Sequence, residues 1–294
     1  MQKRSALAAI LVLVALASWA ATPEASPDSS LTTFRVTTAE VHVTFTAVLA
    51  KNQRVSSLTA ADFTLLRDGL PIDQIVSFSR DQHAPLAALV LTDVSDSMMK
   101  ALPMERSAAD WLRANSTAND HLVFRDFGYE IETDRMNSAV NRQMTSLYDA
   151  LIETLPQTGN TGGRRALILL SDGADNYSYH SLLDVIALAQ RLDVAIYAIT
   201  AHGKNQYYRP DLLQKLCDDT GGKYYDVRKL EGMLSAISNI NDDLRNGFEV
   251  VFRPAVAGAG MHQLSMESHE RGLRFFHRAA YYQPPSSEEI TSVR

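Results

Sequence analysis

Residues 86–97 read LAALVLTDVSDS, an uninterrupted apolar run that ends in a cluster of aspartates and serines. A strand that is apolar on both faces is typical of a parallel sheet covered by helices on either side. A second run of this kind, ALILL at 166–170, ends in the same way, in Ser171-Asp172-Gly173. The two runs predict an α/β fold whose polar residues gather where the strands end.

The same alternation of strand and helix patterns extends from residue 83 to residue 246. We expect strands at 86–93, 121–127, 166–170 and 194–199. We expect a first helix that ends near residue 116, and three further helices at 147–155, 182–192 and 229–245. Each expected strand is short, and each expected helix carries one apolar face. The pattern predicts a doubly wound, mainly parallel sheet of the Rossmann type.

The two ends of the chain carry antiparallel patterns instead. Runs rich in β-branched and aromatic residues predict strands within 34–50, at 62–66 and 72–78 around an Asp68-Gly69 turn, and at 248–252, 261–266 and 273–282. The segments 34–82 and 247–285 are each too small to form a stable sandwich alone. We therefore predict that they pair in one small antiparallel β-sandwich, into which the α/β domain of residues 83–246 is inserted.

The first 20 residues are predicted to be a signal peptide. Lys3 and Arg4 precede an uncharged apolar run, and Ser18-Trp19-Ala20 supplies the small residues of a cleavage site. The run is shorter than the 20 or so apolar residues that span a bilayer. We expect a secreted or periplasmic mature chain with no membrane contact beyond this peptide. Two flanking segments complete the prediction: a disordered lead-in at 21–33 and a tail at 286–294.

The composition excludes several kinds of partner and site. The 294 residues carry 28 Lys and Arg against 34 Asp and Glu, a net charge of −6. A general electrostatic attachment to nucleic acid or to anionic lipid is therefore not expected. Cys217 is the single cysteine, which excludes an intramolecular disulfide and a zinc site built from several thiolates. Nothing in the sequence indicates an oligomeric state.

Oxygen-bearing side chains from three loops are expected at one edge of the sheet. They are Asp93, Ser95 and Ser97 after the first strand, Thr145 before the helix at 147, and Asp172 after the strand at 166–170. Open α/β sheets bind ligands at the carboxyl ends of their strands, so we predict that these five residues form a metal site. Such oxygens suit a hard dication, Mg²⁺ or else Ca²⁺ or Mn²⁺. No catalytic residue and no organic cofactor is predicted.

The ligand types also indicate what the ion would do. We interpret Ser95 and Ser97 as direct ligands, Thr145 as a direct or water-bridged one, and the two aspartates as acting mainly through water. Neutral hydroxyl ligands leave a dication electrophilic, so an open position would attract an Asp or Glu of a partner protein. Two alternatives stay open: a calcium-stabilised structural module without a ligand, and a metal-free loop in which the serines cap the following helix.

Three motifs, in this order, resemble a known family: DVSDSM at 93–98, TSLYDAL at 145–151 and ILLSDGADN at 168–176. Together they are similar to the von Willebrand factor type A (vWA) domain with its metal-ion-dependent adhesion site. The shorter motifs are similar to bacterial exported proteins described as VWFA-related, and they are Asp62-Phe63, Asp68-Gly69, Ser77-Phe78-Ser79 and Ala280-Tyr281-Tyr282. The resemblance covers about residues 34–284. It implies the vWA fold, a role in adhesion or other protein binding, and metal positions at Asp93, Ser95, Ser97, Thr145 and Asp172.

This chain departs from the family pattern at two places. Asp96 stands where these proteins usually carry Gly or Asn, which adds negative charge near the ion. The loop before Thr145 lacks the glycines that often precede this threonine.

An enzyme is the alternative function. A phosphatase with an aspartyl nucleophile would carry a second aspartate where this chain has Ser95. A serine hydrolase would need a GxSxG motif, which the sequence lacks. We therefore predict a binding protein that is not an enzyme, with a metal-dependent, phosphatase-like hydrolase as the alternative.

Overall fold

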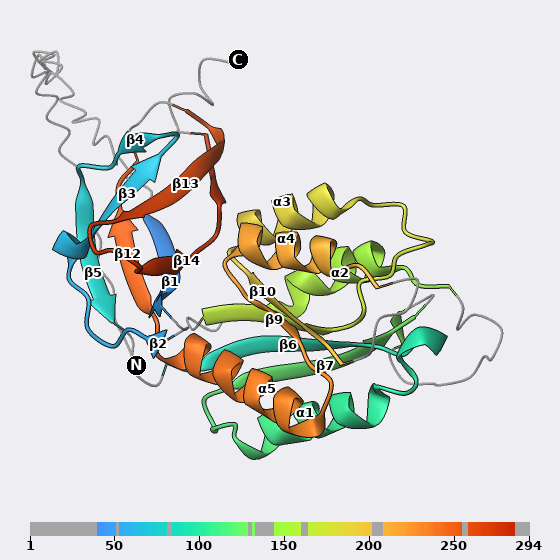
Figure 1. Cartoon of the computed structure of the whole chain (residues 1–294). Coiled ribbons are helices and arrows are strands. Elements are labelled where there is room, and N and C mark those ends of the chain that lie inside the picture. The colour runs from blue at the N-terminus through green and yellow to red at the C-terminus, as the bar shows by residue number, and fades with distance from the viewer. Residues whose placement is uncertain are drawn as a thin grey trace, which may run out of the picture. The chain divides into compact units, whose positions relative to one another are not determined.

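The computed structural model of the chain describes residues 40–50, 53–80, 84–128, 131–132, 144–159, 164–201, 208–254 and 258–285. The predicted signal peptide, the lead-in and the tail lie outside these residues. The described residues form a mixed α/β structure with one mainly parallel sheet and separate antiparallel sheets (Figure 1). This confirms the sequence prediction at the level of fold class.

Among the described residues, the mainly parallel sheet has six strands in the order β11-β10-β9-β6-β7-β8, of which five are parallel and β8 is antiparallel to β7. Its strands are β6 (Leu86–Asp93), β7 (His121–Phe127), β8 (Ile131–Glu132), β9 (Arg164–Leu170), β10 (Ala195–Thr200) and β11 (Tyr224–Asp226). Every residue of the central β6 is buried. Full burial explains why this strand has an apolar sequence on both faces.

Helices lie on both faces of this sheet (Figure 1). The elements are α1 (Leu102–Ala114) and α5 (Leu230–Arg245) on one face, and α2 (Leu147–Thr154), α3 (Leu182–Leu192) and α4 (Pro210–Thr220) on the other. Val90 of β6 belongs to the core cluster with α1 and α5, whereas the next residue, Leu91, belongs to the cluster with the other three helices. No helix in the described part of the chain is both long and apolar enough to cross a membrane.

The direction of winding reverses between β6 and β9. From β6 the chain passes to β7 on one side, and it later returns to β9 on the other side of β6. The loop after β6 leads to α1, and the loop after β9 leads to α3 on the opposite face of the sheet. Such a reversal opens a crevice at the carboxyl ends of the two strands. In this chain those strands end at Asp93 and Leu170.

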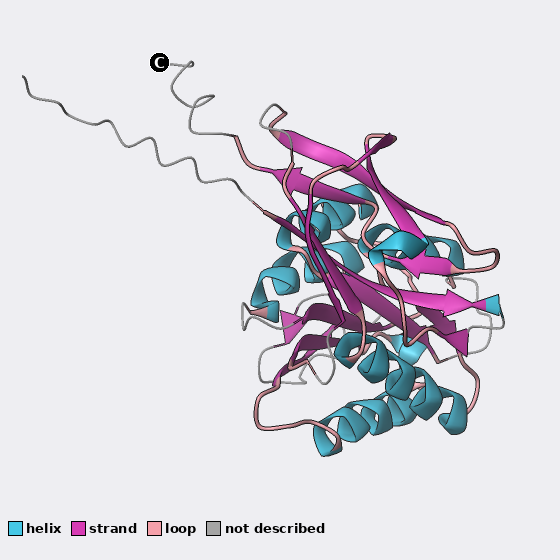
Figure 2. Cartoon of the chain, turned by 90° about the vertical axis from the view of Figure 1, so that its left-hand side faces the viewer, coloured by secondary structure: helices cyan, strands magenta, loops and turns pink. Residues whose placement is uncertain are grey.

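The remaining strands form two antiparallel sheets. The first contains β1 (Val41–Leu49), β2 (Gln53–Arg54), β5 (Ile75–Arg80), β12 (Phe248–Phe252) and β14 (Arg274–Phe276), and the second contains β3 (Phe63–Arg67), β4 (Leu70–Pro71), β13 (Gly260–Ser268) and β15 (Ala280–Gln283). Strands from the two ends of the chain pair in both sheets, β1 with β12 and β3 with β13. Figure 2 views the chain from the side on which Figure 1 draws these sheets, with the strands in magenta.

An aromatic core joins the two antiparallel sheets. The ring of Phe45 on β1 lies 5.6 Å from that of Phe63 on β3 and 5.5 Å from that of Phe248 on β12. All three rings are buried. Because the rings come from segments far apart in the sequence, neither segment could build this core alone.

Two strand predictions differ from the structure. Residues 273–282 form β14 and β15 in different sheets, because residues 277–279 between them bond to the α/β part, where Ala279 donates its N–H to the carbonyl of Asp219 at 3.0 Å. The Asp68-Gly69 turn, with φ of 51° and 79°, joins β3 only to the two-residue β4. The next strand, β5, pairs with β12 in the other sheet instead.

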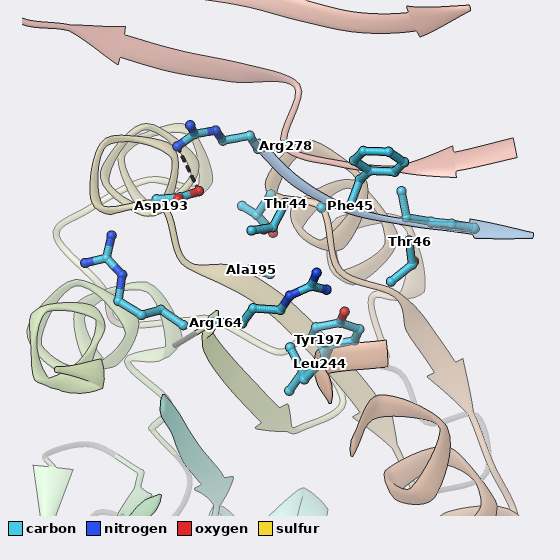
Figure 3. Close-up of a pocket in the computed structure, with 13 residues that line it drawn as sticks. Thr44, Phe45, Thr46, Arg164, Asp193, Ala195, Tyr197, Leu244 and Arg278 are labelled. Carbon is cyan, nitrogen blue, oxygen red and sulfur yellow. Dashed lines mark ion pairs between the residues drawn. The ribbon is translucent and has the colours of Figure 1, made fainter. Parts of the chain in front are cut away.

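A small cavity lies where β1 passes the amino ends of β9 and β10 (Figure 3). Its volume is about 20 Å³, room for about one water molecule. Arg278 at its rim forms an ion pair with Asp193 at 2.8 Å, and Arg164 donates to the carbonyls of Asp243 and Phe248, both at 3.2 Å. This cavity is at the opposite edge of the sheet from the predicted metal residues.

Candidate metal centre

Asp93 ends β6 at the carboxyl edge of the parallel sheet and is fully buried. Its Oδ1 accepts a hydrogen bond of 2.9 Å from the backbone N–H of Ser95, and its Oδ2 accepts one of 2.8 Å from the hydroxyl of Ser171. Ser95 and Ser171 thus donate to different oxygens of this carboxylate, and they hold it between the loops that follow β6 and β9.

The loop after Asp93 turns at once into the short 3-10 helix η3 (Asp96–Met98). Ser95 precedes it with an extended backbone, and the hydroxyl oxygens of Ser95 and Ser97 lie 3.2 Å apart. Ser95 is buried, whereas Asp96 between the two serines is exposed. The two hydroxyls therefore point to one place, as a shared ligand would require, and the extra aspartate lies toward solvent.

Asp172 lies in the loop after β9 and is 1% exposed. Its Oδ1 accepts a hydrogen bond of 3.0 Å from the backbone N–H of Ala174. Gly173 between them has a φ of +83°, and a side chain on it would meet Leu213 and the carbonyl of Arg209 at 3.0–3.1 Å. Glycine is therefore needed for this loop to hold Asp172 tightly against α4.

Thr145 precedes α2 and is also buried. Both backbone groups of Thr145 bond to Asn176 in the loop after β9. The N–H of Thr145 donates to the side-chain oxygen of Asn176 at 2.8 Å, and its carbonyl accepts from the N–H of Asn176 at 3.1 Å. The next residue, Ser146, donates its N–H to the carbonyl of Gly128 at the end of β7 at 2.9 Å. These bonds hold the Thr145 loop beside the loop that carries Asp172.

The structure thus brings the predicted residues to one edge of the sheet to different extents. Asp93, Ser95 and Ser97 form one hydrogen-bonded group, and Ser171 connects this group to the loop of Asp172. Thr145 reaches the same region through Asn176 of that loop. The segment 129–130 and 133–143 before Thr145 lies outside the described residues.

The electrostatics of this edge favour a cation. Burial raises the pKa of Asp93 to about 6, although hydrogen bonds from Ser95 and Ser171 lower it, and the nearby carboxylate of Asp172 raises it further. Two buried carboxylates close enough to repel each other would both be stabilised as anions by a dication between them.

The donor set decides which metals fit. In the described part of the chain, no three His, Cys, Asp or Glu side chains gather closely enough to hold a metal ion. A metal at this edge would therefore need hydroxyl or water ligands as well as carboxylates. All the available side-chain donors are oxygens, so the residues fit a hard dication such as Mg²⁺, Ca²⁺ or Mn²⁺ better than a soft one.

Sequence reasoning missed three residues of this region. Ser171 and Asn176 connect the loops, and Glu105 on α1 is a fully buried carboxyl group whose charge interacts with Asp93 and Asp172. The sequence could have indicated Ser171, because this serine follows a buried strand and directly precedes Asp172. It could also have indicated Glu105, because this residue interrupts the apolar face of α1 that Ala108 and Leu112 continue.

No family model matches the chain, and a search of the curated proteins finds no match either.

Proposed function

We propose that this chain is an exported, metal-dependent protein-binding protein with a vWA-like α/β domain at residues 83–246. The observation that carries the proposal is the bond from Ser171 to Asp93, because it joins the ends of β6 and β9 at the point where the winding reverses. Open α/β sheets bind ligands at such a point. The side chains gathered there are hydroxyls and carboxylates, which is the chemistry of the vWA motifs quoted above.

Each residue has a definite part in this proposal. Ser95, Ser97 and Thr145 hold the ion through neutral oxygens, and Asp93 and Asp172 hold its water ligands while compensating its charge. Bound there, a dication supplies a positive charge that attracts a carboxylate. The partner then binds through an Asp or Glu, and the surrounding loops select which partner fits. The segments 34–82 and 247–285 serve as a β scaffold, and the signal peptide delivers the protein to the periplasm or outside the cell.

A peptide-binding experiment tests this proposal. The purified protein is screened in Mg²⁺ against a random peptide library, and each selected peptide is remade with its acidic residue changed to the amide. We expect the protein to bind the peptides with Asp or Glu and not their amide versions. This binding should be lost when a chelator is added and in the Ser95→Ala variant. Ser265→Ala, an exposed serine of β13, is the matched control and should bind as the wild type does.

Four other results would contradict the proposal. Equal binding of the amide peptides, or binding that survives the chelator, would remove the acidic-ligand mechanism. A metal that raises the melting temperature without any effect on peptide binding would favour a purely structural ion. Turnover of p-nitrophenyl phosphate that Asp93→Asn abolishes would favour the hydrolase.

A further inference from the structure

Glu105 is a buried acidic residue in the first turn of α1, eight positions after Ser97. Its side chain is 0% exposed. Glutamate is almost never fully buried unless it is paired. Its burial here therefore needs an explanation that the hydrophobic core does not provide.

The position of α1 places Glu105 beside the candidate metal centre. Glu105 shares the buried face of the helix with Ala108, Ala109 and Leu112, and Ala108 and Leu112 belong to the core cluster that contains Val90 of β6. That face is therefore turned to the sheet. Because α1 comes soon after the Ser95–Ser97 loop, its first turn lies near the carboxyl edge of the sheet. Glu105 is in this turn, about one helical turn before Ala108 and Ala109.

A second contact fixes the first turn of α1 at this edge. Arg106, the residue after Glu105, forms a bidentate ion pair with Asp126. Its Nη1 donates to Oδ1 of Asp126 at 3.0 Å, and its Nη2 donates to Oδ2. Asp126 lies near the end of β7 and is the register partner of Thr92, which precedes Asp93 on β6. This contact holds the first turn of α1, which carries Glu105, near the end of β6 where Asp93 lies.

Neither carboxyl oxygen of Glu105 has a hydrogen-bond partner in the described part of the chain. Burial raises the pKa of Glu105 well above its usual value, and Asp93, Asp172 and Asp126 raise it further while Arg106 opposes them. A buried polar group with no partner is destabilising, and in native proteins such a group often marks an unseen water or ion.

We propose that Glu105 is an outer anion of the candidate metal centre, where its carboxylate accepts a hydrogen bond from a water molecule bound to the dication. This inference rests on the proposed metal site. The proposal places water between Glu105 and the ion, since no three acidic, histidine or cysteine side chains among the described residues gather closely enough to hold one ion. Mg²⁺ in particular retains several waters when it binds to proteins.

This role has two opposite effects. A third carboxylate near the ion strengthens its binding through charge, and partners that hold metal-bound groups in place typically contribute 10- to 100-fold in affinity. The same negative charge reduces the net positive charge that an acidic partner meets. Glu105 therefore strengthens ion binding at the expense of partner binding.

Calorimetric titration with Mn²⁺ tests the inference. The variants are Glu105→Gln, which keeps the shape and removes the charge, and Ser95→Ala, which removes a proposed direct ligand. Asp110→Asn is the matched control, because Asp110 is an exposed carboxylate on the same helix. We expect Glu105→Gln to weaken Mn²⁺ binding about tenfold or more, Ser95→Ala to remove most of it, and Asp110→Asn to leave it unchanged.

The outcomes separate this inference from the proposed function. Loss in Ser95→Ala with unchanged affinity in Glu105→Gln would overturn the role of Glu105 and leave the metal site intact. No Mn²⁺ binding by the wild type would overturn both. Should Glu105→Gln fail to fold, the size-matched pair Glu105→Asp and Glu105→Asn carries the comparison: at least tenfold tighter binding by the aspartate variant supports the role, and equal binding contradicts it.

Discussion

The hydroxyl of Ser171 donates a 2.8 Å hydrogen bond to the carboxylate of Asp93, across 78 positions of sequence. Both residues are fully buried. The bond joins the ends of β9 and β6, the two strands between which the winding of the sheet reverses. It orients Asp93 in the manner in which outer hydrogen bonds orient metal-binding side chains.

Removing this hydroxyl should therefore weaken metal binding without removing a ligand. We expect Ser171→Ala to lower Mn²⁺ affinity about tenfold in calorimetric titration, because Asp93 loses one of the donors that orient it. Ser265→Ala should bind Mn²⁺ as tightly as the wild type. Equal affinity in Ser171→Ala and the wild type would show that this bond serves the fold alone.

At saturating Mn²⁺ the charge of Glu105 should act in the opposite direction on the partner. Glu105→Gln is expected to bind a selected acidic peptide at least as tightly as the wild type, because the loaded site has one negative charge fewer. Fluorescence anisotropy of the labelled peptide measures this affinity. A clearly weaker complex in Glu105→Gln would contradict the proposed position of the charge.

The lowered pKa of Asp120 predicts how the stability of the fold depends on pH. Burial raises its pKa, but bonds from Arg245 and from the N–H groups of Leu86 and Thr117 outweigh this and hold the pKa at about 2, below the ordinary 3.8. The carboxylate therefore stabilises the fold above about pH 4, and its contribution of about 2 kcal/mol is lost as the pH falls from about 4 to 2.

Asp120→Asn should accordingly lower stability by about 3 kcal/mol at pH 7, since Arg245 loses a buried partner at 2.6 Å. The loss should shrink toward pH 2. Urea unfolding of wild type and variant at several pH values measures it. A loss that is the same at pH 7 and pH 2 would contradict the assigned role of the ion pair.

Gly222 has no room for a side chain. A Cβ atom there would overlap the carbonyl of Ile196, which is held in β10 between two neighbouring strands. We expect Gly222→Ala to lower the free energy of unfolding by about 2 kcal/mol or more. Gly128→Ala is the control, because the nearest atom to its Cβ would be 4.0 Å away, on Val94. Similar unfolding midpoints for the two variants would contradict this packing.

Asp193 ends α3 in the left-handed conformation, with a φ of 56°, and pairs with Arg278 at 2.8 Å. Asn tolerates this conformation, so Asp193→Asn should lose only the ion pair, about 0.5–1 kcal/mol. Asp193→Ala adds the backbone strain and should lose about 1 kcal/mol more. Thermal unfolding of both variants measures the difference, and equal melting temperatures would show that the strain contributes nothing.

Sequence periodicity predicted the elements that are fully buried or that carry one long apolar face. The expected strand at 86–93 coincides with β6, and the expected helix at 229–245 coincides with α5 except for one residue, because full burial and a long apolar face leave clear patterns. The bounds of the helix α4 were not predicted. Its buried face is short, with Leu213, Leu216 and Cys217 among several charged residues.

Contacts between distant segments account for what the pattern could not predict. The break between β14 and β15 comes from bonds of residues 277–279 to the α/β part, and no local property of the sequence shows them. In the candidate metal centre, the loops themselves follow from strand ends in the sequence. The Ser171–Asp93 bond and the inward direction of Glu105 depend instead on strand order and helix rotation, which only the folded chain determines.

The most direct measurement of the central claim is an anomalous difference map from crystals grown in Mn²⁺. The account predicts one strong peak at the carboxyl edge of the sheet, within about 2.5 Å of the hydroxyl oxygens of Ser95 and Ser97. A map with no peak between the loops of Asp93, Thr145 and Asp172, at a Mn²⁺ concentration that saturates any binding seen in solution, would contradict it.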